Sequence, residues 1–248
     1  MGENDRVPLY RDEAVVLRTH KLGEADRIIT LLTRQHGRVR AVAKGVRRTM
    51  SKFGSRLEPF THVEVQLAEG RNLDTVTQAE THDAFAAQLG ADYERYTAGT
   101  VMLETAERLV TEEKEPSTQQ FLLLVGGLRA MVGSQRRPNQ VLDSYLLRSL
   151  AVAGYAPSFD HCARCGLEGP HRWFNPSLGG MLCTTCRVPG SASPAAETIT
   201  LLGALLAGDW PTVEVAEPRH LREASGLVAA FLAWHLERGL RSLAYVER

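Results

Sequence analysis

The segment Arg38-Val39-Arg40-Ala41-Val42-Ala43-Lys44 alternates between two kinds of side chain. Its odd positions are apolar, whereas Arg38, Arg40 and Lys44 place cations on even positions. Successive side chains of a β-strand point to opposite faces, so a period of two separates these two sets. The pattern predicts a strand that packs one face on a core and presents cations on the other.

This strand lies inside a run of basic residues. Between Arg34 and Arg56 the chain carries eight basic side chains and no acidic one, although the whole protein is neutral, with 29 of each. Because like charges repel unless an anion binds to them, we predict a nucleic-acid surface here. A solvated charged loop is the alternative. The predicted contacts are Arg38, Arg40, Lys44, Arg47, Arg48, Lys52 and Arg56.

Four more short strands, each bounded by turn residues, are predicted near the N-terminus at 13–19, 27–33, 62–67 and 73–78. With 38–44 they make five strands, and a five-stranded Greek-key barrel of this size is the oligonucleotide-binding (OB) fold. Its second and third strands form the ligand face, which agrees with the cationic third strand. Phe53, in the loop that follows, could stack on a base or anchor the loop on the barrel, and we favour the anchor.

From Asp83 onward the apolar positions recur every three or four residues, which is typical of amphipathic helices. Ser193 followed by Pro194 is a candidate helix start. The predicted buried stripes are Leu103, Ala106, Leu109 and Val110; Phe121, Leu124, Val125 and Leu128; Leu142, Tyr145, Leu146 and Ser149; and Ala224, Leu227, Phe231 and Trp234.

All four cysteines lie in two pairs, Cys162-Ala163-Arg164-Cys165 and Cys183-Thr184-Thr185-Cys186, which are 17 residues apart. Each pair places two thiolates on one tight turn, and two such turns supply the closed tetrahedral set that Zn²⁺ prefers. We therefore predict one structural zinc ion held by Cys162, Cys165, Cys183 and Cys186. Two disulfides are the alternative, and a cytosolic location disfavours them.

The predicted fold class is multidomain α+β, with an N-terminal five-stranded OB-fold barrel, an α-helical bundle and an inserted zinc-ribbon-like module of four cysteines. The expected domains are the nucleic-acid-binding barrel at 1–82, the first part of the helical domain at 83–159, the zinc module at 160–190 and the C-terminal part of the helical domain at 191–248.

We find no catalytic motif, and therefore expect a protein that is not an enzyme. His62-Val63-Glu64 has the His-x-Glu form of zinc deaminases, but neither cysteine pair begins with Pro-Cys, so His62 and Glu64 are interpreted as outward residues of a strand. The N-terminus has no apolar signal region, and no uncharged apolar run approaches the roughly 20 residues of a membrane span. We expect a cytoplasmic protein that does not bind membranes.

Several stretches resemble the RecO family of bacterial DNA repair proteins. They are residues 22–33, which begin Leu22-Gly23-Glu24-Ala25-Asp26-Arg27, residues 37–45, residues 57–60, and the cysteine pairs with Gly179-Gly180 before the second. The resemblance runs from about Tyr10 to near the C-terminus and is most specific in the first 80 residues. It includes the order of barrel, helices and zinc insertion.

The resemblance implies a recombination mediator that binds single- and double-stranded DNA and anneals complementary strands. It also implies three protein partners: RecR, the C-terminal tail of single-strand-binding protein and, indirectly, the RecA recombinase, which the mediator helps to load. The four cysteines match the zinc ligands of that family, in which some members lack them. The alternatives are an RNA-binding OB-fold protein and a zinc-containing scaffold for protein interactions.

Overall fold

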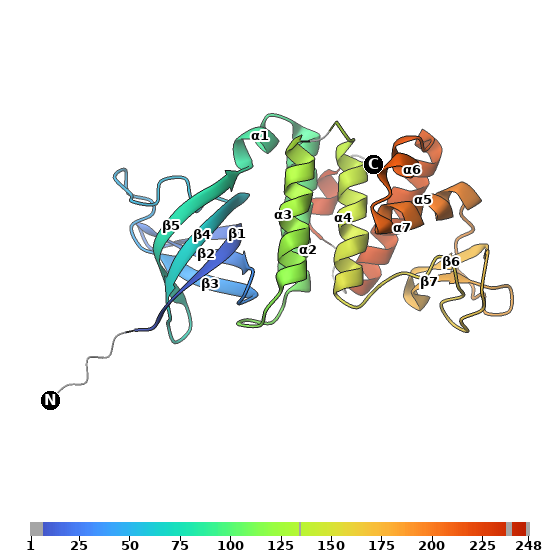
Figure 1. Cartoon of the computed structure of the whole chain (residues 1–248), viewed down its shortest axis with the longest axis horizontal. Helices are drawn as coiled ribbons and strands as arrows, with labels where there is room; N and C mark the ends of the chain where they lie inside the picture. Colours follow the sequence, from blue (N-terminus) through green and yellow to red (C-terminus); the bar gives the residue numbers. More distant parts are fainter. Residues whose placement is uncertain (1–6, 134, 237–239, 247–248) are drawn as a thin grey trace. The chain divides into compact units, whose positions relative to one another are not determined.

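A computed structural model describes residues 7–133, 135–236 and 240–246 of the chain (Figure 1). These residues fall into two compact units. Among the described residues, the first unit draws on 7–93 and 106–132, and the second on 94–105, 133, 135–236 and 240–246. None of the described helices combines the length and the apolar character needed to cross a membrane.

Five strands form the centre of the first unit. Their order is β1-β2-β3-β5-β4, and β4 pairs again with β1, so the sheet returns to its first strand. Neighbouring strands are antiparallel except β3 and β5, which are parallel. The five predicted strands are confirmed, and the first and last are longer than expected. The bounds are β1 (Leu9–Leu22), β2 (Asp26–Thr33), β3 (Arg38–Ala43), β4 (Thr61–Ala68) and β5 (Asp74–Ala84).

The barrel core follows from the alternation along the strands. In β3, Val39, Ala41 and Ala43 are at most 4% exposed, while Arg40 is exposed. Full burial of one branched apolar side chain contributes about 1.5–3 kcal/mol, so the shared core favours this register over a slipped one. The other strands contribute Ala14, Val16, Ile29, Leu31, Val63, Val65, Leu67 and Val76 to the same cluster.

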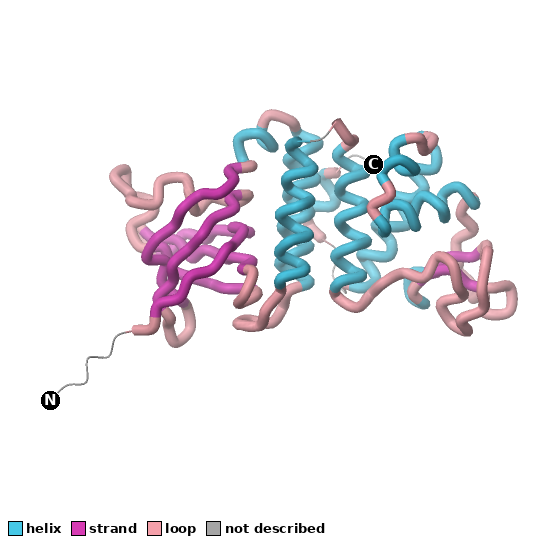
Figure 2. Tube along the Cα trace, viewed as in Figure 1, coloured by secondary structure: helices cyan, strands magenta, loops and turns pink. Residues whose placement is uncertain are grey.

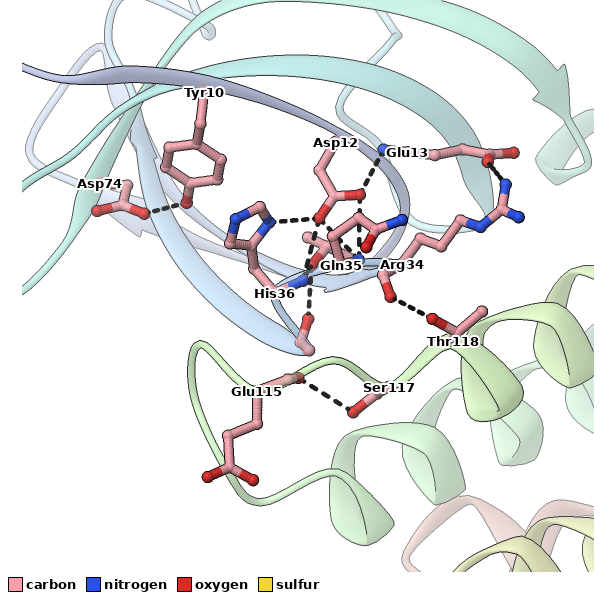
Figure 3. Close-up of polar contacts among 12 residues, drawn as sticks. Tyr10, Asp12, Glu13, Arg34, Gln35, His36, Asp74, Glu115, Ser117 and Thr118 are labelled. Atoms are coloured by element: carbon pink, nitrogen blue, oxygen red, sulfur yellow. Dashed lines mark hydrogen bonds and ion pairs between the residues drawn. The ribbon is translucent and has the colours of Figure 1, made fainter.

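The turn between β2 and β3 is held by one buried carboxylate. Asp12 accepts hydrogen bonds from the backbone N–H groups of Gln35 and His36, and it lies 2.7 Å from His36 Nδ1 (Figure 3). Its side chain is 1% exposed, so these donors replace the water that a carboxylate otherwise requires. The turn is thereby fixed at the base of the cationic strand.

Three helices accompany the barrel: α1 (Ala86–Gly90), α2 (Tyr93–Leu109) and α3 (Thr118–Gly133). Residues of α2 belong to both compact units, and α3 up to Val132 belongs to the first. The loop between α2 and α3 lies on the β2–β3 turn, where the Lys114 N–H donates to His36 O at 3.0 Å. The Thr118 hydroxyl donates to Arg34 O at 3.0 Å (Figure 3). Hydrogen bonds to backbone carbonyls thus fasten this loop to the barrel.

The second unit contains further helices and one small hairpin. Within the described residues, strands occur in the barrel and in this hairpin (Figure 2). The predicted stripe of Leu142, Tyr145 and Leu146 is buried, and the Tyr145 hydroxyl donates to Met102 O at 3.2 Å. The elements are α4 (Pro138–Val152), β6 (Trp173–Asn175), the 3₁₀ segment η1 (Pro176–Leu178), β7 (Gly180–Leu182), α5 (Ala196–Ala207), α6 (Trp210–Glu214), α7 (Pro218–His235) and the 3₁₀ segment η2 (Ser242–Tyr245).

Two local predictions in this unit are wrong. Trp234 is 59% exposed. The buried face of α7 follows Ala224, Val228 and Phe231. Because each residue of a helix is rotated by 100° from the one before, position 234 lies at the margin of this buried face. Helix α5 begins at Ala196, so Ser193 is not its N-cap. The Ser193 hydroxyl instead accepts a hydrogen bond from Arg172 Nε at 2.9 Å.

Gly37 provides a test of the contact between turn and loop. Its φ is +59°, and a Cβ at this position would lie 2.3 Å from Glu115 O. Gly54 has a similar φ of +53° but open space around it. We expect Gly54→Ala to cost only the left-handed backbone penalty, about 1–2 kcal/mol, and Gly37→Ala to cost clearly more. Thermal unfolding of the two variants measures this difference, and equal melting temperatures would show that the loop does not pack on the turn.

Candidate nucleic-acid interface and metal centre

Three predicted contact residues carry positive charges that no other side chain pairs with. Arg40 is exposed on β3, Lys44 follows the strand, and Arg48 lies in the β3–β4 loop. In the described part of the chain, none of these side chains makes an ion pair or hydrogen bond. The Arg48 side chain passes beside Gly45, the residue that follows Lys44 in the chain. These residues offer a ligand three cations whose charge no acidic side chain neutralises.

Three more cations fasten the loop while remaining exposed. Arg47 donates to Gly23 O at 3.2 Å and to Glu24 O at 2.8 Å, which joins the loop to the β1–β2 turn. Lys52 donates to Thr77 O of β5 at 2.9 Å, and Arg56 donates to Lys52 O at 2.8 Å. Backbone carbonyls carry no net charge, so each side chain keeps its positive charge while its position is fixed.

Arg38 differs from the other predicted contacts. Its guanidinium donates to Thr111 O at 2.8 Å and lies 3.8 Å from a carboxylate oxygen of Glu113. Its side chain is only 25% exposed. The nearby carboxylate offsets its charge, so the geometry favours a structural role at the α2–α3 loop over a contact with an anion.

Phe53 anchors the loop in the barrel core. It is 2% exposed, and Val46 and Leu57 of the same loop join the same apolar cluster. The preferred sequence interpretation is confirmed, since a buried ring offers no face to a base. At the start of the loop, the Gly45 N–H donates to an Asp26 carboxylate oxygen at 2.7 Å. The cationic loop is therefore held at several points along its length.

The four cysteines form one cluster in the second unit. Their sulfur atoms all lie within 4.8 Å of one another, and Cys165 Sγ is 3.8 Å from Cys183 Sγ. A tetrahedral ion with Zn–S bonds of about 2.3 Å would separate its sulfurs by about 3.8 Å. None of the four is in a disulfide. The residues present therefore fit a four-thiolate metal site.

Two tight turns bring the sulfurs together. The first closes with Gly166 N–H donating to Cys162 O at 2.8 Å, where Gly166 has a φ of +74°. The second closes with Cys186 N–H donating to Cys183 O at 3.1 Å. Gly180, at the start of β7, approaches so closely that a Cβ would lie 2.2 Å from Ser158 O. Glycine is required there for β7 to pack against the backbone of Ser158, four residues before Cys162.

The thiols of the cluster are not equivalent. Burial opposes ionisation of Cys162, but backbone N–H groups of both turns donate to its sulfur and lower its pKa to about 6. The side chains of Cys183 and Cys165 raise the pKa of Cys186 to about 12. Several thiolates at this distance repel one another, and a bound dication removes that repulsion.

A chain of charges runs from β4 of the barrel to α3. His62 on β4 is 2% exposed, with Nε2 2.8 Å from Glu13 and Nδ1 2.9 Å from Asp83. Arg34 lies 3.1 Å from Glu13, and Arg129 of α3 lies 2.8 Å from Asp83. Both ring nitrogens thus face carboxylates, and the buried ring bridges Glu13 and Asp83.

The prediction that His62 is an ordinary outward strand residue is incomplete. It points away from the barrel core but is buried beside Phe121 of α3, with ring centroids 5.8 Å apart. Glu64, its partner in the His-x-Glu pattern, instead pairs with Arg11 at 3.4 Å. Because the carboxylates beside His62 come from distant parts of the sequence, local patterning gave no signal for this cluster.

Family models match almost the whole chain. The model described as Recombination protein O N terminal matches residues 7–85, and the model described as Recombination protein O C terminal matches residues 90–244. The chain belongs to the RecO family.

Relatives of this RecO-family chain match over their full length. A protein named DNA repair protein RecO from Nocardioides sp. is 80% identical over 97% of this chain and 100% of its own. Proteins of the same name from Streptomyces avermitilis and Thermobifida fusca are 62% and 59% identical, each over 97% of this chain and 99% of its own. The resemblance found in the sequence is confirmed.

The His62 cluster predicts a pH-dependent loss of stability. For Glu13, burial raises the pKa, but hydrogen bonds from His62 and Arg34 outweigh burial, and the net pKa is lowered. The pKa of Asp83 is lowered chiefly by its hydrogen bond to His62. A carboxylate whose pKa is lower in the folded than in the unfolded protein stabilises the fold at any pH above its unfolded pKa, which is about 4. This contribution is lost as the pH falls through the lower pKa of the folded protein.

We expect His62→Gln to lower the free energy of unfolding by about 1.5–3 kcal/mol at pH 7, because glutamine cannot keep the hydrogen bonds of the ring to both carboxylates. The difference from wild type should shrink below about pH 4, where the carboxylates protonate. Glu64→Gln is the control, since its exposed pair should contribute below about 1 kcal/mol. Urea unfolding at pH 7 and pH 3 measures both variants. An equal loss for His62→Gln at the two pH values would contradict the charge chain.

Proposed function

We propose that this RecO-family chain is a recombination mediator that binds single- and double-stranded DNA through the cationic barrel face and anneals complementary strands. Membership of the RecO family supports a role in DNA repair and recombination. The observation that carries the finer proposal is the set Arg40, Lys44 and Arg48, on β3 and the fastened loop after it, whose charges no acidic side chain neutralises. Phosphates of any sequence satisfy such a surface.

The proposed mechanism uses binding energy alone. Phosphates are neutralised and their counterions released by three cations that no acidic side chain pairs with, namely Arg40, Lys44 and Arg48. The exposed Arg47, Lys52 and Arg56 assist them. Two strands held on one cationic surface repel each other less, so their pairing becomes easier. No covalent step is required, and the chain acts without being an enzyme.

The protein partners follow from the family resemblance and are proposed with it. We propose that the chain works with RecR, recognises the C-terminal tail of single-strand-binding protein, and promotes loading of RecA on coated strands. Such work places the protein in the cytoplasm at the nucleoid. We likewise propose the domain division at 1–82, 83–159, 160–190 and 191–248, in which the barrel binds DNA and the helical part serves partners.

We propose that the four-cysteine cluster holds one Zn²⁺ with a structural role. Its four ligands are Cys162, Cys165, Cys183 and Cys186, and four protein thiolates leave no position open for water. The ion would organise a small apolar cluster that contains Leu182 and the partly buried Trp173. The barrel face does not include these residues, so DNA binding should not require the metal directly.

The DNA-binding proposal is tested by fluorescence anisotropy of a labelled single-stranded oligonucleotide across a salt series, together with an annealing assay. We expect Arg40→Ala/Lys44→Ala to weaken binding and annealing. The slope of log K against log salt should flatten by about 1.4, because two phosphate contacts are lost at about 0.7 each.

Arg38→Ala is the matched control, since its charge is already offset by Glu113. It should leave the salt slope unchanged within error. If Arg40→Ala/Lys44→Ala binds and anneals like wild type, the barrel face is not the DNA surface. Stronger binding to RNA than to DNA in competition would favour the RNA-binding alternative, and weak salt-insensitive binding would favour a protein scaffold.

Metal analysis tests the zinc proposal. We expect one zinc ion per chain by elemental analysis, and we expect Cys162→Ser/Cys183→Ser to lose it and to unfold the second unit at lower temperature. Anisotropy of the same variant should show the wild-type salt slope, because the barrel is a separate compact unit. A full complement of zinc in the double variant would contradict the assignment of ligands.

A further inference from the structure

Met50 lies at the tip of the cationic loop and is 94% exposed. The other methionines in the described part of the chain, Met102, Met131 and Met181, are at most 1% exposed. A single exposed apolar side chain on a protein surface usually needs no explanation. The position of Met50, its fastened support and the charges around it set it apart.

A backbone turn presents Met50 to solvent. The Ser51 N–H donates to Arg48 O at 2.9 Å, so Thr49 and Met50 are the two central residues of a β-turn. A preceding turn closes with the Arg48 N–H donating to Gly45 O at 3.1 Å. Figure 1 shows the β3–β4 loop extending away from the strands of the barrel.

Buried anchors flank the tip on both sides. Val46 precedes it and Phe53 follows it, and both pack in the barrel core. The Phe53 N–H also donates to the Ser51 hydroxyl at 3.2 Å. Met50 is therefore an apolar side chain on a fastened support, and inserting it into a ligand orders little additional backbone.

The surroundings of Met50 specify the kind of ligand. Arg48 and Lys52 are exposed on either side of it, and no acidic residue occurs between Arg34 and Arg56. The ligand must combine closely spaced negative charges with apolar faces between them. A nucleic acid has this chemistry, because phosphates alternate with bases that stack through apolar faces.

We propose that Met50 is a wedge that enters between two neighbouring bases when the phosphates of the same strand lie on Arg48 and Lys52. This inference rests on the proposed DNA-binding function and adds a contact to the bases. Methionine is among the side chains that part base steps in other nucleic-acid complexes.

The test uses an oligonucleotide with 2-aminopurine, whose fluorescence rises when it is unstacked from its neighbours. We expect wild type to raise this fluorescence. Met50→Ala should abolish the rise and weaken binding roughly fivefold, within the range found when a base-stacking side chain is removed. Its salt slope should equal that of wild type, because the phosphate contacts remain. Met50→Leu, which keeps an apolar wedge, should restore the rise.

Thr49→Ala, at the adjacent exposed turn position, is the matched control and should behave like wild type. If wild type binds with a steep salt slope but Met50→Ala keeps the fluorescence rise, the wedge is wrong and the cationic surface stands. If wild type shows no salt-dependent binding, the proposed function fails and the wedge with it. A larger effect of Met50→Ala on binding to phosphatidylglycerol vesicles than to DNA would assign the tip to a lipid surface and overturn the wedge.

Discussion

Burial of Phe53 and Leu57 in the barrel core holds the cationic surface in place. Five like charges between Lys44 and Arg56 favour an expanded loop, and burial of each large apolar side chain opposes this by about 1.5–3 kcal/mol. The same residues define where the loop returns to the barrel before β4. Without these anchors the exposed cations would be dispersed, and a ligand would have to order the loop upon binding.

The basic residues between Arg34 and Arg56 have different roles, which depend on the groups around each of them. Arg34 and Arg38 face Glu13 and Glu113 and contribute to the packing of the first unit. Backbone carbonyls fix Arg47 and Lys52 without neutralising them, and Arg40, Lys44 and Arg48 remain uncommitted. The number of cations in the sequence therefore overestimates the number that an anion can reach. This distinction explains why substitutions within one run should have different effects on affinity.

Patterns that depend on neighbouring residues could be predicted from the sequence. The alternation in β3 located the barrel, and the two cysteine pairs located the sulfur cluster. Phe53 was correctly interpreted as an anchor. Contacts between distant residues could not be predicted in this way, because Arg38 meets the 111–113 segment only after the helices fold back on the barrel.

The same reason explains the buried His62, whose partners Glu13 and Asp83 lie on other strands. The misassigned Trp234 has a different origin. Its helical spacing fits the apolar stripe of α7 approximately, and the packing of the neighbouring helices decides which margin of that stripe is covered. No sequence pattern distinguishes Met50, because its distinguishing feature is its exposure at the centre of a turn.

The most direct test of a preorganised cationic loop is amide hydrogen exchange across residues 45–58, measured with and without a single-stranded oligonucleotide. We predict that the amides of Arg48, Ser51 and Arg56, which donate within the loop, exchange slowly in the free protein and more slowly with DNA. Fast exchange in the free protein, or protection by DNA confined to the helices of the second unit, would contradict it.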